Sequence, residues 1–280
     1  MKVLVTGSSG LIGSQVASDL AASDDTVVGY DILAGRDILD PVALKGAARG
    51  CDAIVHSAAL LGLPDQDDGR IMATNLQGTW NVLSAAREAE IRRVVFLSSV
   101  DALGVFKGER EPDYLPLDDD HPCYPGTPYG MSKHLAEAMC RLFSESSDVS
   151  VVCLRPPGVW TDETYAWIQS ERAKRAEFEW TPFWEYGAFI DVRDLSRACI
   201  CALTCEVEKS SCLLVSSADI STSGRTSREL ADLVMPDVEW RGGAEYEAEP
   251  FRSLLNIENA GSTLGWAPLH SWQSYVERNA

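Results

Sequence analysis

Near its amino terminus the chain reads Val3-Leu4-Val5-Thr6-Gly7-Ser8-Ser9-Gly10-Leu11-Ile12-Gly13. An apolar run passes into three glycines spaced three apart, and a helix-like pattern follows. In such a turn the first glycine permits the tight bend, the second lets backbone approach a pyrophosphate, and the third lets the helix pack on the strand. The free N–H groups that open the helix favour an anion. A purely structural turn is the alternative, but the order of strand, glycines and helix predicts a dinucleotide site.

A second apolar run ends at Asp31, 18 residues after Gly13. A carboxylate at this place accepts hydrogen bonds from an adenosine ribose and repels a 2′-phosphate. The sequence therefore predicts NAD as the cofactor and makes NADP less favoured, although the nearby Arg36 weakens that preference. The alternative role for Asp31 is to cap the turn that follows it.

Short β-rich runs alternate with helical stretches through the first half of the chain. The expected strands are 2–6, 26–30, 53–56, 94–98 and 150–154, and the expected helices lie near 11–22, 70–90 and 128–146. Strands with few polar interruptions are typical of a parallel sheet that helices cover on both faces. The pattern predicts a doubly wound α/β fold of the Rossmann type.

After Arg155 the composition changes. Nine of the 23 aromatic residues lie in 160–189, and the tail beyond 205 mixes a strand, a helix opened by Thr226 or Ser227, and loops. We therefore expect a dinucleotide-binding domain made of 1–157 with about 188–205. The remaining 158–187 and 206–280 would form a small C-terminal α/β substrate lobe.

Composition excludes several classes of function. The 280 residues are 45% hydrophobic, and 24 basic against 42 acidic residues give a formal net charge of −18. No cationic surface for nucleic acid is expected. No apolar run approaches the ~18 residues of a membrane span, and no signal peptide is recognisable, so we expect a cytoplasmic protein. The eight cysteines contain no Cys-x-x-Cys pair and the four histidines lack zinc spacing, so no metal is expected.

A second motif, Thr127-Pro128-Tyr129-Gly130-Met131-Ser132-Lys133, predicts catalytic groups. Thr127 is a suitable N-cap and Pro128 suits the first helical position. Tyr129 and Lys133 then share one helical face. A free tyrosine has a pKa near ~10, and we expect the ammonium and the helix dipole to lower the pKa of Tyr129 so that it acts as a base. An exposed pair on a helix is the alternative for this motif alone.

The run Val94-Val95-Phe96-Leu97-Ser98-Ser99 reads as a buried strand that ends in hydroxyls. Ligands of a doubly wound sheet bind at the carboxyl ends of its strands. Ser99 would therefore hold the substrate oxygen while Tyr129 exchanges its proton.

Together these motifs resemble the extended short-chain dehydrogenase/reductase family, in its NAD-dependent epimerase/dehydratase group, over roughly residues 1–205. The matching residues are Thr6–Gly13, Asp31, Asp37-Ile38, His56-Ser57-Ala58-Ala59, Asn75, Ser98-Ser99, Tyr129 with Lys133, Arg155-Pro156, and Phe189-Ile190-Asp191-Val192-Arg193-Asp194. Apart from the resemblance, His56 is expected to be a structural residue at a strand end.

The resemblance implies that Ser99, Tyr129 and Lys133 are catalytic, with Lys133 also on the nicotinamide ribose. It places Asp37 and Ile38 by the adenine. The cofactor-binding residues it implies are Gly7, Ser9, Gly10, Leu11, Ile12, Gly13, Asp31, Asp37, Ile38, Ser57, Ala58, Ala59, Asn75, Leu97, Tyr129, Lys133 and Pro156, of which Ala58 and Ala59 would lie by the phosphates.

Departures from the family pattern bear on the substrate. Nucleotide-sugar epimerases usually have Asn at the place of Gly158 and His at the place of Asp191, and their C-terminal domains are longer. The short tail is more similar to uronate or aldose dehydrogenases, although those carry Asn-His where this chain has Val100-Asp101. In the dehydratase branch an acid at the place of Asp101 is a general acid/base; a solvated loop residue is the alternative.

Residues on the substrate side follow from weaker patterns. We expect contributions from Ser99, Val100, Asp101, Gly158, Arg172 and Arg175. The two arginines would hold a carboxylate or phosphate, and a solvated helix face is their alternative. The aromatic cluster offers flat faces to a sugar ring, or it is simply the core of the lobe.

The sequence thus predicts an NAD-dependent oxidoreductase that acts on a hydroxyl of a sugar or sugar-acid-like substrate. The second hypothesis is a nucleotide-sugar 4-epimerase that retains its NAD, and the third is a non-catalytic dinucleotide sensor. Family members often dimerise through helices near 70–90 and 128–146, so the resemblance implies a homodimer with a four-helix interface; a monomer is the alternative.

Overall fold

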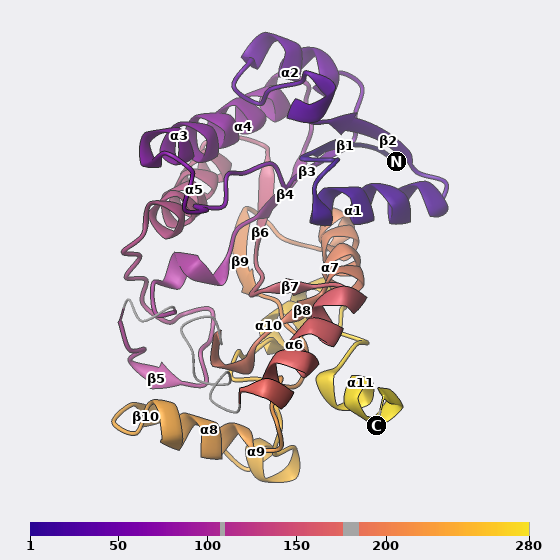
Figure 1. Cartoon of the computed structure of the whole chain (residues 1–280). Coiled ribbons are helices and arrows are strands. Elements are labelled where there is room, and N and C mark those ends of the chain that lie inside the picture. The colour runs from indigo at the N-terminus through magenta and orange to yellow at the C-terminus, as the bar shows by residue number, and fades with distance from the viewer. Residues whose placement is uncertain (107–109, 176–184, 280) are drawn as a thin grey trace.

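A parallel six-stranded sheet forms the centre of the computed structural model, which describes residues 1–106, 110–175 and 185–279 (Figure 1). The strand order is β2-β1-β3-β4-β6-β9, so the chain reverses its direction of winding between β1 and β3. The strands are β1 (Lys2–Thr6), β2 (Thr26–Tyr30), β3 (Ala53–His56), β4 (Arg93–Leu97), β6 (Ser150–Arg155) and β9 (Ser210–Leu214). This confirms the predicted doubly wound α/β fold.

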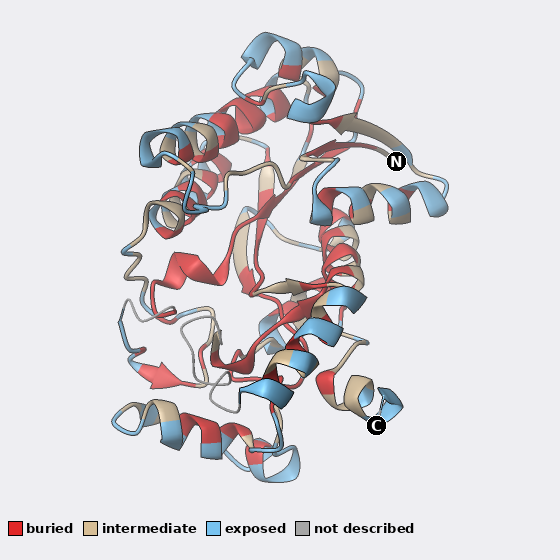
Figure 2. Cartoon of the chain, in the orientation of Figure 1, coloured by how far each residue is buried: buried red, intermediate tan, exposed pale blue. Residues whose placement is uncertain are grey.

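Helices cover both faces of the sheet (Figure 1). One face carries α1 (Leu11–Ala22) and α7 (Val192–Thr204), and the other carries α2 (Pro41–Ala48), α4 (Gly78–Glu88) and α5 (Pro128–Glu145). Successive strand residues alternate between these two cores because side chains of a strand point to opposite faces. In β1, Val3 and Val5 join the first core and Leu4 joins the second. Figure 2 shows the resulting pattern, with buried strands and helices exposed on their outer sides.

The helices begin where the sequence provides caps. The Thr127 hydroxyl accepts a hydrogen bond from the Gly130 N–H, and Pro128 occupies the first turn of α5. The helix α8 (Ser227–Val234) opens with Thr226 and Glu229 in a reciprocal capping box. Both starts agree with the predicted ones, because these residues satisfy the free N–H groups of a first helical turn.

A smaller lobe lies beyond the carboxyl ends of the strands. It contains two further parallel strand pairs, β5 with β10 and β7 with β8. Its own core gathers buried apolar residues such as Phe106, Leu117 and Leu254. The elements of this region are β5 (Tyr114–Leu115), β7 (Val159–Trp160), α6 (Asp162–Lys174), β8 (Ile190–Asp191), α8, β10 (Glu239–Trp240), α9 (Glu245–Ala248) and α11 (Trp272–Asn279).

Three of the nine aromatic residues, Trp160, Tyr165 and Phe189, form a buried cluster within this lobe together with Trp272. Trp160 stacks on Phe189 with ring centroids 4.4 Å apart, and Tyr165 and Trp272 complete the buried group. These rings pack against one another in the core of the lobe, so they do not form a surface for a sugar ring. Four of the nine aromatics, Phe178, Trp180, Phe183 and Trp184, lie outside the described residues.

The division between the two parts differs from the predicted one. Residues 206–280 were assigned to the lobe, yet β9 is the sixth strand of the central sheet, paired with β6. Ala260 and Leu264 of α10 (Glu258–Leu264) also pack in the first core. The tail therefore contributes to both parts. The sequence does not predict this, because pairing between strands so far apart in the chain leaves no local signal. Within the described ranges, no helix has the length and apolar character needed to cross a membrane.

Candidate active site

The glycine turn is closed by backbone contacts that exclude side chains. Gly7 adopts a left-handed φ of +69°, and its N–H donates to the Tyr30 carbonyl at 2.9 Å. A Cβ on Gly7 would lie 2.7 Å from the Ala58 nitrogen, and one on Gly13 would lie 2.1 Å from the Gly7 oxygen. These distances explain the first and third glycines of the motif, since the turn, α1 and the end of β3 meet there.

A cavity of about 410 Å³ opens between the carboxyl ends of β1, β2 and β3. Nine of the predicted cofactor residues line it: Gly7, Ser9, Gly10, Asp31, Asp37, Ile38, Ser57, Ala58 and Ala59. The structure therefore brings residues from three separate loops to the place where doubly wound folds bind nucleotides. The other predicted cofactor residues, which do not line this cavity, are Leu11, Ile12, Gly13, Asn75, Leu97, Tyr129, Lys133 and Pro156.

Asp31 caps the turn that follows it, which is one of the two roles considered for it, and its contact with a ribose stays a prediction. Its two carboxylate oxygens accept hydrogen bonds from the backbone N–H groups of Ser9 and Leu33, each at 2.9 Å, so it caps the 3₁₀ turn η1 (Ile32–Ala34) and braces the glycine turn. It also lines the cavity. Arg36 lines the cavity too, and its guanidinium donates to the Gly29 carbonyl at 2.7 Å.

His56 is a structural residue, as expected. Its two ring nitrogens contact the hydroxyls of Thr6 at 2.7 Å and Thr79 at 3.1 Å. Burial lowers the pKa of His56 to about 3, and the charge of Lys133 acts in the same direction. The imidazole is therefore neutral and joins β1 and β3 to helix α4.

Asn75 positions its neighbours, and its predicted contact with the cofactor stays a prediction. It lies in a π-helical turn, η2 (Ala73–Gln77), that links α3 (Asp68–Met72) to α4. Its side chain accepts from the Leu60 N–H at 2.8 Å and donates to the Leu60 carbonyl and the Ser132 hydroxyl, both at 2.9 Å. Both amide hydrogens are thus used inside the protein. Ser132 in turn donates to the Tyr129 carbonyl at 2.7 Å.

Ser99 and Tyr129 meet at the edge of the sheet. The Ser99 hydroxyl lowers the pKa of Tyr129, and it accepts a hydrogen bond from the Asp101 N–H at 3.1 Å, which opens the short helix η3 (Val100–Leu103). The start of α5 rests directly on η3, since a Cβ on Gly130 would lie 2.6 Å from the Asp101 carbonyl oxygen. Two motifs separated in the sequence therefore converge, as predicted.

Lys133 lies on the same side of α5 as Tyr129. Its ammonium donates to the Leu97 carbonyl at 2.6 Å and lies 5.7 Å from the centroid of the Tyr129 ring. Burial lowers the pKa of Lys133 to about 8, and the negative charge of Glu137 opposes that shift. The lysine is thus a buried cation held by backbone rather than an exposed one.

The expected low pKa of Tyr129 is wrong for the structure in this state. Burial raises the pKa of its phenol above the ordinary value, and the charges of Asp101 and Glu185 raise it further. The Ser99 hydroxyl lowers the pKa of Tyr129 and so acts against these effects. Loss of water around a buried phenol disfavours the phenolate, and here that effect is the largest of those acting on the pKa of Tyr129.

A buried ion pair that the sequence motifs did not reveal supports the same helix. Glu137 lies one turn after Lys133, and its carboxylate accepts two hydrogen bonds from the Arg155 guanidinium, each 2.9 Å long. The Ser98 hydroxyl donates to Glu137 at 2.6 Å. Through this carboxylate, α5 is joined to the ends of β4 and β6. In the sequence, Glu137 is marked only by its position four residues after Lys133, which places both on one face of α5.

Several predicted substrate residues take other positions. The Val100 side chain is buried in the core of the lobe. Arg172 is buried; it donates to the Ser221 carbonyl at 2.8 Å and lies 4.9 Å from the Trp272 ring. Arg175 is exposed and pairs with Glu171 at 2.7 Å. Val100 and Arg172 therefore have partners inside the lobe, and Arg175, the residue after α6, has one at the surface; contact of these three residues with a substrate stays a prediction.

Gly158 and Asp101 remain at the site. Gly158 follows the end of β6, and its N–H donates to the Glu185 carboxylate at 2.6 Å. Asp101 is buried beside Tyr129 in η3. Glu185 is a residue that sequence reasoning missed, since it lies in a segment with no recognisable motif.

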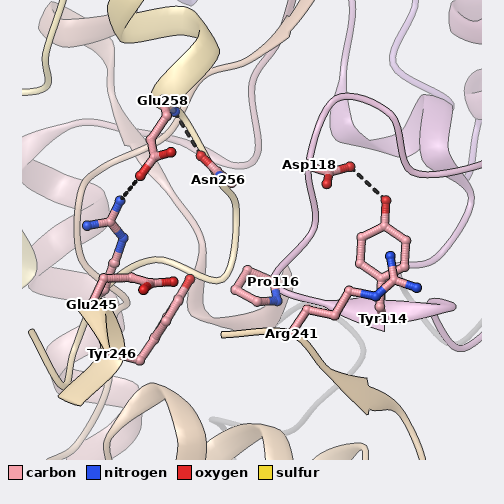
Figure 3. A pocket seen from close by; sticks show the side chains of 9 residues that line it. Tyr114, Pro116, Asp118, Arg241, Glu245, Tyr246, Asn256 and Glu258 are labelled. Carbon is pink, nitrogen blue, oxygen red and sulfur yellow. Dashed lines mark hydrogen bonds and ion pairs between the residues drawn. The ribbon is translucent and has the colours of Figure 1, made fainter. Parts of the chain in front are cut away.

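A second pocket, of about 110 Å³, lies within the lobe (Figure 3). Its charged side chains pair with one another: Arg252 with Glu258 at 2.8 Å, and the Tyr114 hydroxyl with Asp118 at 2.7 Å. It shares no lining residue with the nucleotide cavity. In the described ranges, no group of three or more His, Cys, Asp or Glu side chains is arranged to hold a metal ion.

Comparisons with known proteins agree with this geometry. The model of the NAD dependent epimerase/dehydratase family matches residues 3–211. A UDP-glucose 4-epimerase of Rhizobium meliloti is 26% identical over 326 residues, covering 98% of this chain and 94% of that protein. An L-arabinose 1-dehydrogenase (NAD(P)(+)) of Haloferax volcanii is 30% identical over 168 residues, covering 55% and 65% respectively.

The fold has solved counterparts as well. A crystal structure of a short-chain dehydrogenase/reductase superfamily protein from Agrobacterium tumefaciens, with bound NAD, superposes with a TM-score of 0.72 at 23% identity, covering 99% of this chain and 95% of that one. At that identity the likeness shows the fold alone, while the family match extends over most of the chain. The chain belongs to the NAD-dependent epimerase/dehydratase family.

Proposed function

We propose that this protein is an NAD-dependent oxidoreductase acting on a hydroxyl group of a sugar or sugar-acid-like substrate. The observation that carries the proposal is the convergence of Ser99 and Tyr129, where the start of α5 packs on η3, with Lys133 on the same helical face. The pair lies at the edge of the sheet on which the nucleotide cavity opens. A phenol next to a dinucleotide site, with a buried ammonium on the same helical face, is suited to moving a hydroxyl proton.

The residues of the cavity fit NAD. A Cβ would fill the cradle at Gly7 and Gly13, so the backbone there is shaped for close approach. Gly10 is the N-cap of helix α1 and provides no side-chain cap, which leaves the first N–H groups of the helix available to a pyrophosphate. The carboxylate of Asp31 favours a free ribose over one that carries a 2′-phosphate, which supports NAD over NADP.

Each catalytic side chain then has a distinct role. NAD, when bound, supplies the nicotinamide ring that accepts a hydride from the carbon bearing the hydroxyl group. Ser99 donates a hydrogen bond to the substrate oxygen, and Tyr129 takes the proton of that hydroxyl. The Lys133 ammonium, anchored on the Leu97 carbonyl, stabilises the negative charge that forms on the phenol.

A second candidate, a nucleotide-sugar 4-epimerase, is favoured by the Rhizobium meliloti relative, which aligns with nearly the whole chain. The partial match to an arabinose dehydrogenase favours the first candidate. A non-catalytic sensor is disfavoured, because a sensor has no need for a phenol that exchanges a proton with a substrate.

Incubation with NAD and a panel of aldoses, uronates and UDP-sugars separates these candidates. A dehydrogenase accumulates NADH in proportion to product, whereas an epimerase interconverts two sugars without net reduction. The proposal predicts NADH formation that is lost in Tyr129→Phe, with Glu88→Gln as a surface control of unchanged activity. Interconversion of UDP-sugars without NADH would establish the alternative instead.

We also propose that two copies of the chain associate through α4 and α5. Met131, Leu135 and Leu142 are exposed along one face of α5, and Trp80 of α4 is exposed beside them, in edge contact with Phe143. A second copy would cover this apolar stripe in a four-helix arrangement. Analytical ultracentrifugation should give a dimer for the wild type and a monomer for Leu135→Glu; a monomeric wild type would refute the interface.

A further inference from the structure

The Lys133 ammonium is buried at a place where its charge must be balanced by the protein. Lys133 is only 3% exposed. Its ammonium donates to the carbonyl of Leu97, the last residue of β4, at 2.6 Å and lies 4.9 Å from the centroid of the Phe96 ring. Removal from water disfavours the charged form of a lysine, and a carbonyl dipole with a ring face replaces only part of the lost hydration. The ammonium therefore depends on what holds this carbonyl and on the nearest opposite charge.

Glu137 holds the end of the strand that carries this carbonyl. Ser98 follows Leu97 directly, and its hydroxyl donates to the Glu137 carboxylate at 2.6 Å. The N–H of the same Leu97–Ser98 peptide donates to the Leu154 carbonyl of β6 at 2.8 Å. Glu137 also accepts two hydrogen bonds from the Arg155 guanidinium, each 2.9 Å long. The peptide that binds the ammonium is thus fixed by β6 and by a carboxylate of α5.

The same carboxylate is the counter-charge of the ammonium. Glu137 is four residues after Lys133 on α5, which places both on one helical face. Burial lowers the pKa of Lys133, and the negative charge of Glu137 opposes that shift. Arg155 limits this effect, because its guanidinium pairs with the same carboxylate and both side chains of that pair are buried.

Other titratable groups lie around the ammonium. They come from α5, β3 and β6: Tyr129, Cys140, His56 and Cys153. Thiols are mostly neutral near pH 7. Burial raises the pKa of Tyr129 and lowers that of His56 to about 3, so both are neutral as well. On η3, Asp101 raises the pKa of Tyr129 further. Within the set that acts on Lys133, the negative charge is therefore that of Glu137.

We propose that Glu137 is a positioning residue of the active site, which holds the Leu97 carbonyl against the Lys133 ammonium and supplies the negative charge that keeps this ammonium protonated. The inference rests on the proposed function, in which the ammonium stabilises negative charge on the Tyr129 phenol. Without the carboxylate charge, Lys133 would release its proton to water near neutral pH, and the phenol would lose that stabilisation. Glu137 thus acts on the reaction through Lys133.

The first test measures the protonation of Lys133 without a substrate. Protein labelled with 13C at the lysine Cε is titrated by NMR, and the Lys133 signal is assigned by its absence from Lys133→Met. The pKa of Lys133 in the wild type is about 8. Glu137→Gln keeps the oxygen that Ser98 binds but removes the charge, so it should lower this pKa by about one pH unit, a tenfold change. Arg155→Met, which leaves the carboxylate without its cation, should raise it. Glu145→Gln, at an exposed position of the same helix, should leave it unchanged.

A purely structural role predicts a different sign. If Glu137 only held α5 in place, Glu137→Gln and Arg155→Met would both admit water, and the pKa of Lys133 would rise in both toward its ordinary 10.5. A fall in Glu137→Gln with a rise in Arg155→Met supports the inference, and any other combination overturns it. Should Glu137→Gln not fold, as judged by circular dichroism, Glu137→Leu/Arg155→Met takes its place with the same fall expected.

The second test measures the same effect in catalysis. kcat/KM is determined at pH 6 and pH 8 with NAD and an aldose that the wild type oxidises. A pKa lower by one pH unit leaves Lys133 mostly charged at pH 6 but not at pH 8, so the ratio of wild type to Glu137→Gln should be about fivefold larger at pH 8. A ratio that does not change with pH overturns the inference while the proposed function stands. Absence of wild-type turnover with every sugar overturns the proposed function instead, and the NMR titration still decides whether Glu137 keeps Lys133 charged.

Discussion

Replacing Arg155 by methionine tests the buried ion pair that supports the catalytic helix. The side chains of Arg155 and Glu137 are only 7% and 5% exposed, and their closest contact is 2.9 Å. Methionine keeps an unbranched side chain but leaves the Glu137 carboxylate buried without its counter-ion. Removing one partner of such a pair costs about 3–5 kcal/mol, which is a large part of the ~5–15 kcal/mol by which folded domains are stable.

We expect Arg155→Met to lower the free energy of unfolding by that amount, measured by urea denaturation followed by circular dichroism. With roughly 2–4 °C lost for each kcal/mol, Tm should fall by about 6–20 °C. The double variant Glu137→Leu/Arg155→Met should recover part of the loss, because no unpaired charge remains.

The matched control is Arg141→Met on α5, the helix that carries Glu137. The contact of Arg141 with Glu145, 3.4 Å long, is solvent-exposed. It should cost less than about 1 kcal/mol. If Arg155→Met lowers the free energy of unfolding no more than Arg141→Met does, the ion pair does not anchor α5.

Three further predictions concern single residues. Tyr129→Phe should abolish turnover while the Kd for NAD, measured by calorimetry, stays within about threefold, because the phenol moves a proton rather than holding the dinucleotide; retained turnover would remove Tyr129 as the base. Gly13→Ala should abolish NAD binding in the same assay, since its Cβ would lie 2.1 Å from the Gly7 oxygen, and binding of normal affinity would contradict the close packing. His56 has a folded pKa of about 3 against an ordinary 6.5, so below pH 6.5 the unfolded chain binds a proton that the folded chain does not. Stability should therefore be lost as pH falls, by about 2 kcal/mol at pH 5, and His56→Asn should remove that part of the pH dependence; identical pH profiles of the two proteins would disprove it.

Structural features that depend on residues adjacent in the chain could be predicted from the sequence. The glycine turn, the strands that flank it and the helix cap at Thr127 follow from local steric and hydrogen-bonding requirements, and they were found where expected. The convergence of Ser99 and Tyr129 was also predictable, because the carboxyl ends of parallel strands meet at one edge of a sheet.

Features that depend on distant residues could not. Three contacts join segments that are far apart in the chain or share no sequence pattern. They are the pairing of β9 with β6, the ion pair of Glu137 with Arg155, and the hydrogen bond of Glu185 with Gly158. The direction of the Tyr129 pKa shift depends on the balance between burial and several charges, and a sequence reports neither distances nor solvent exposure. Arg172 shows the same limit, since its helical position did not reveal that it bonds Ser221.

The place of β9 in the sheet has a consequence for synthesis of the protein. β6 ends at Arg155 and its outer partner begins at Ser210, 55 residues later (210 − 155). While those residues emerge from the ribosome, the backbone N–H and C=O groups on one side of β6 stay unpaired, which is the kind of strand edge that templates aggregation. A nascent chain stalled before Leu214 is thus expected to need chaperone protection that the finished chain does not.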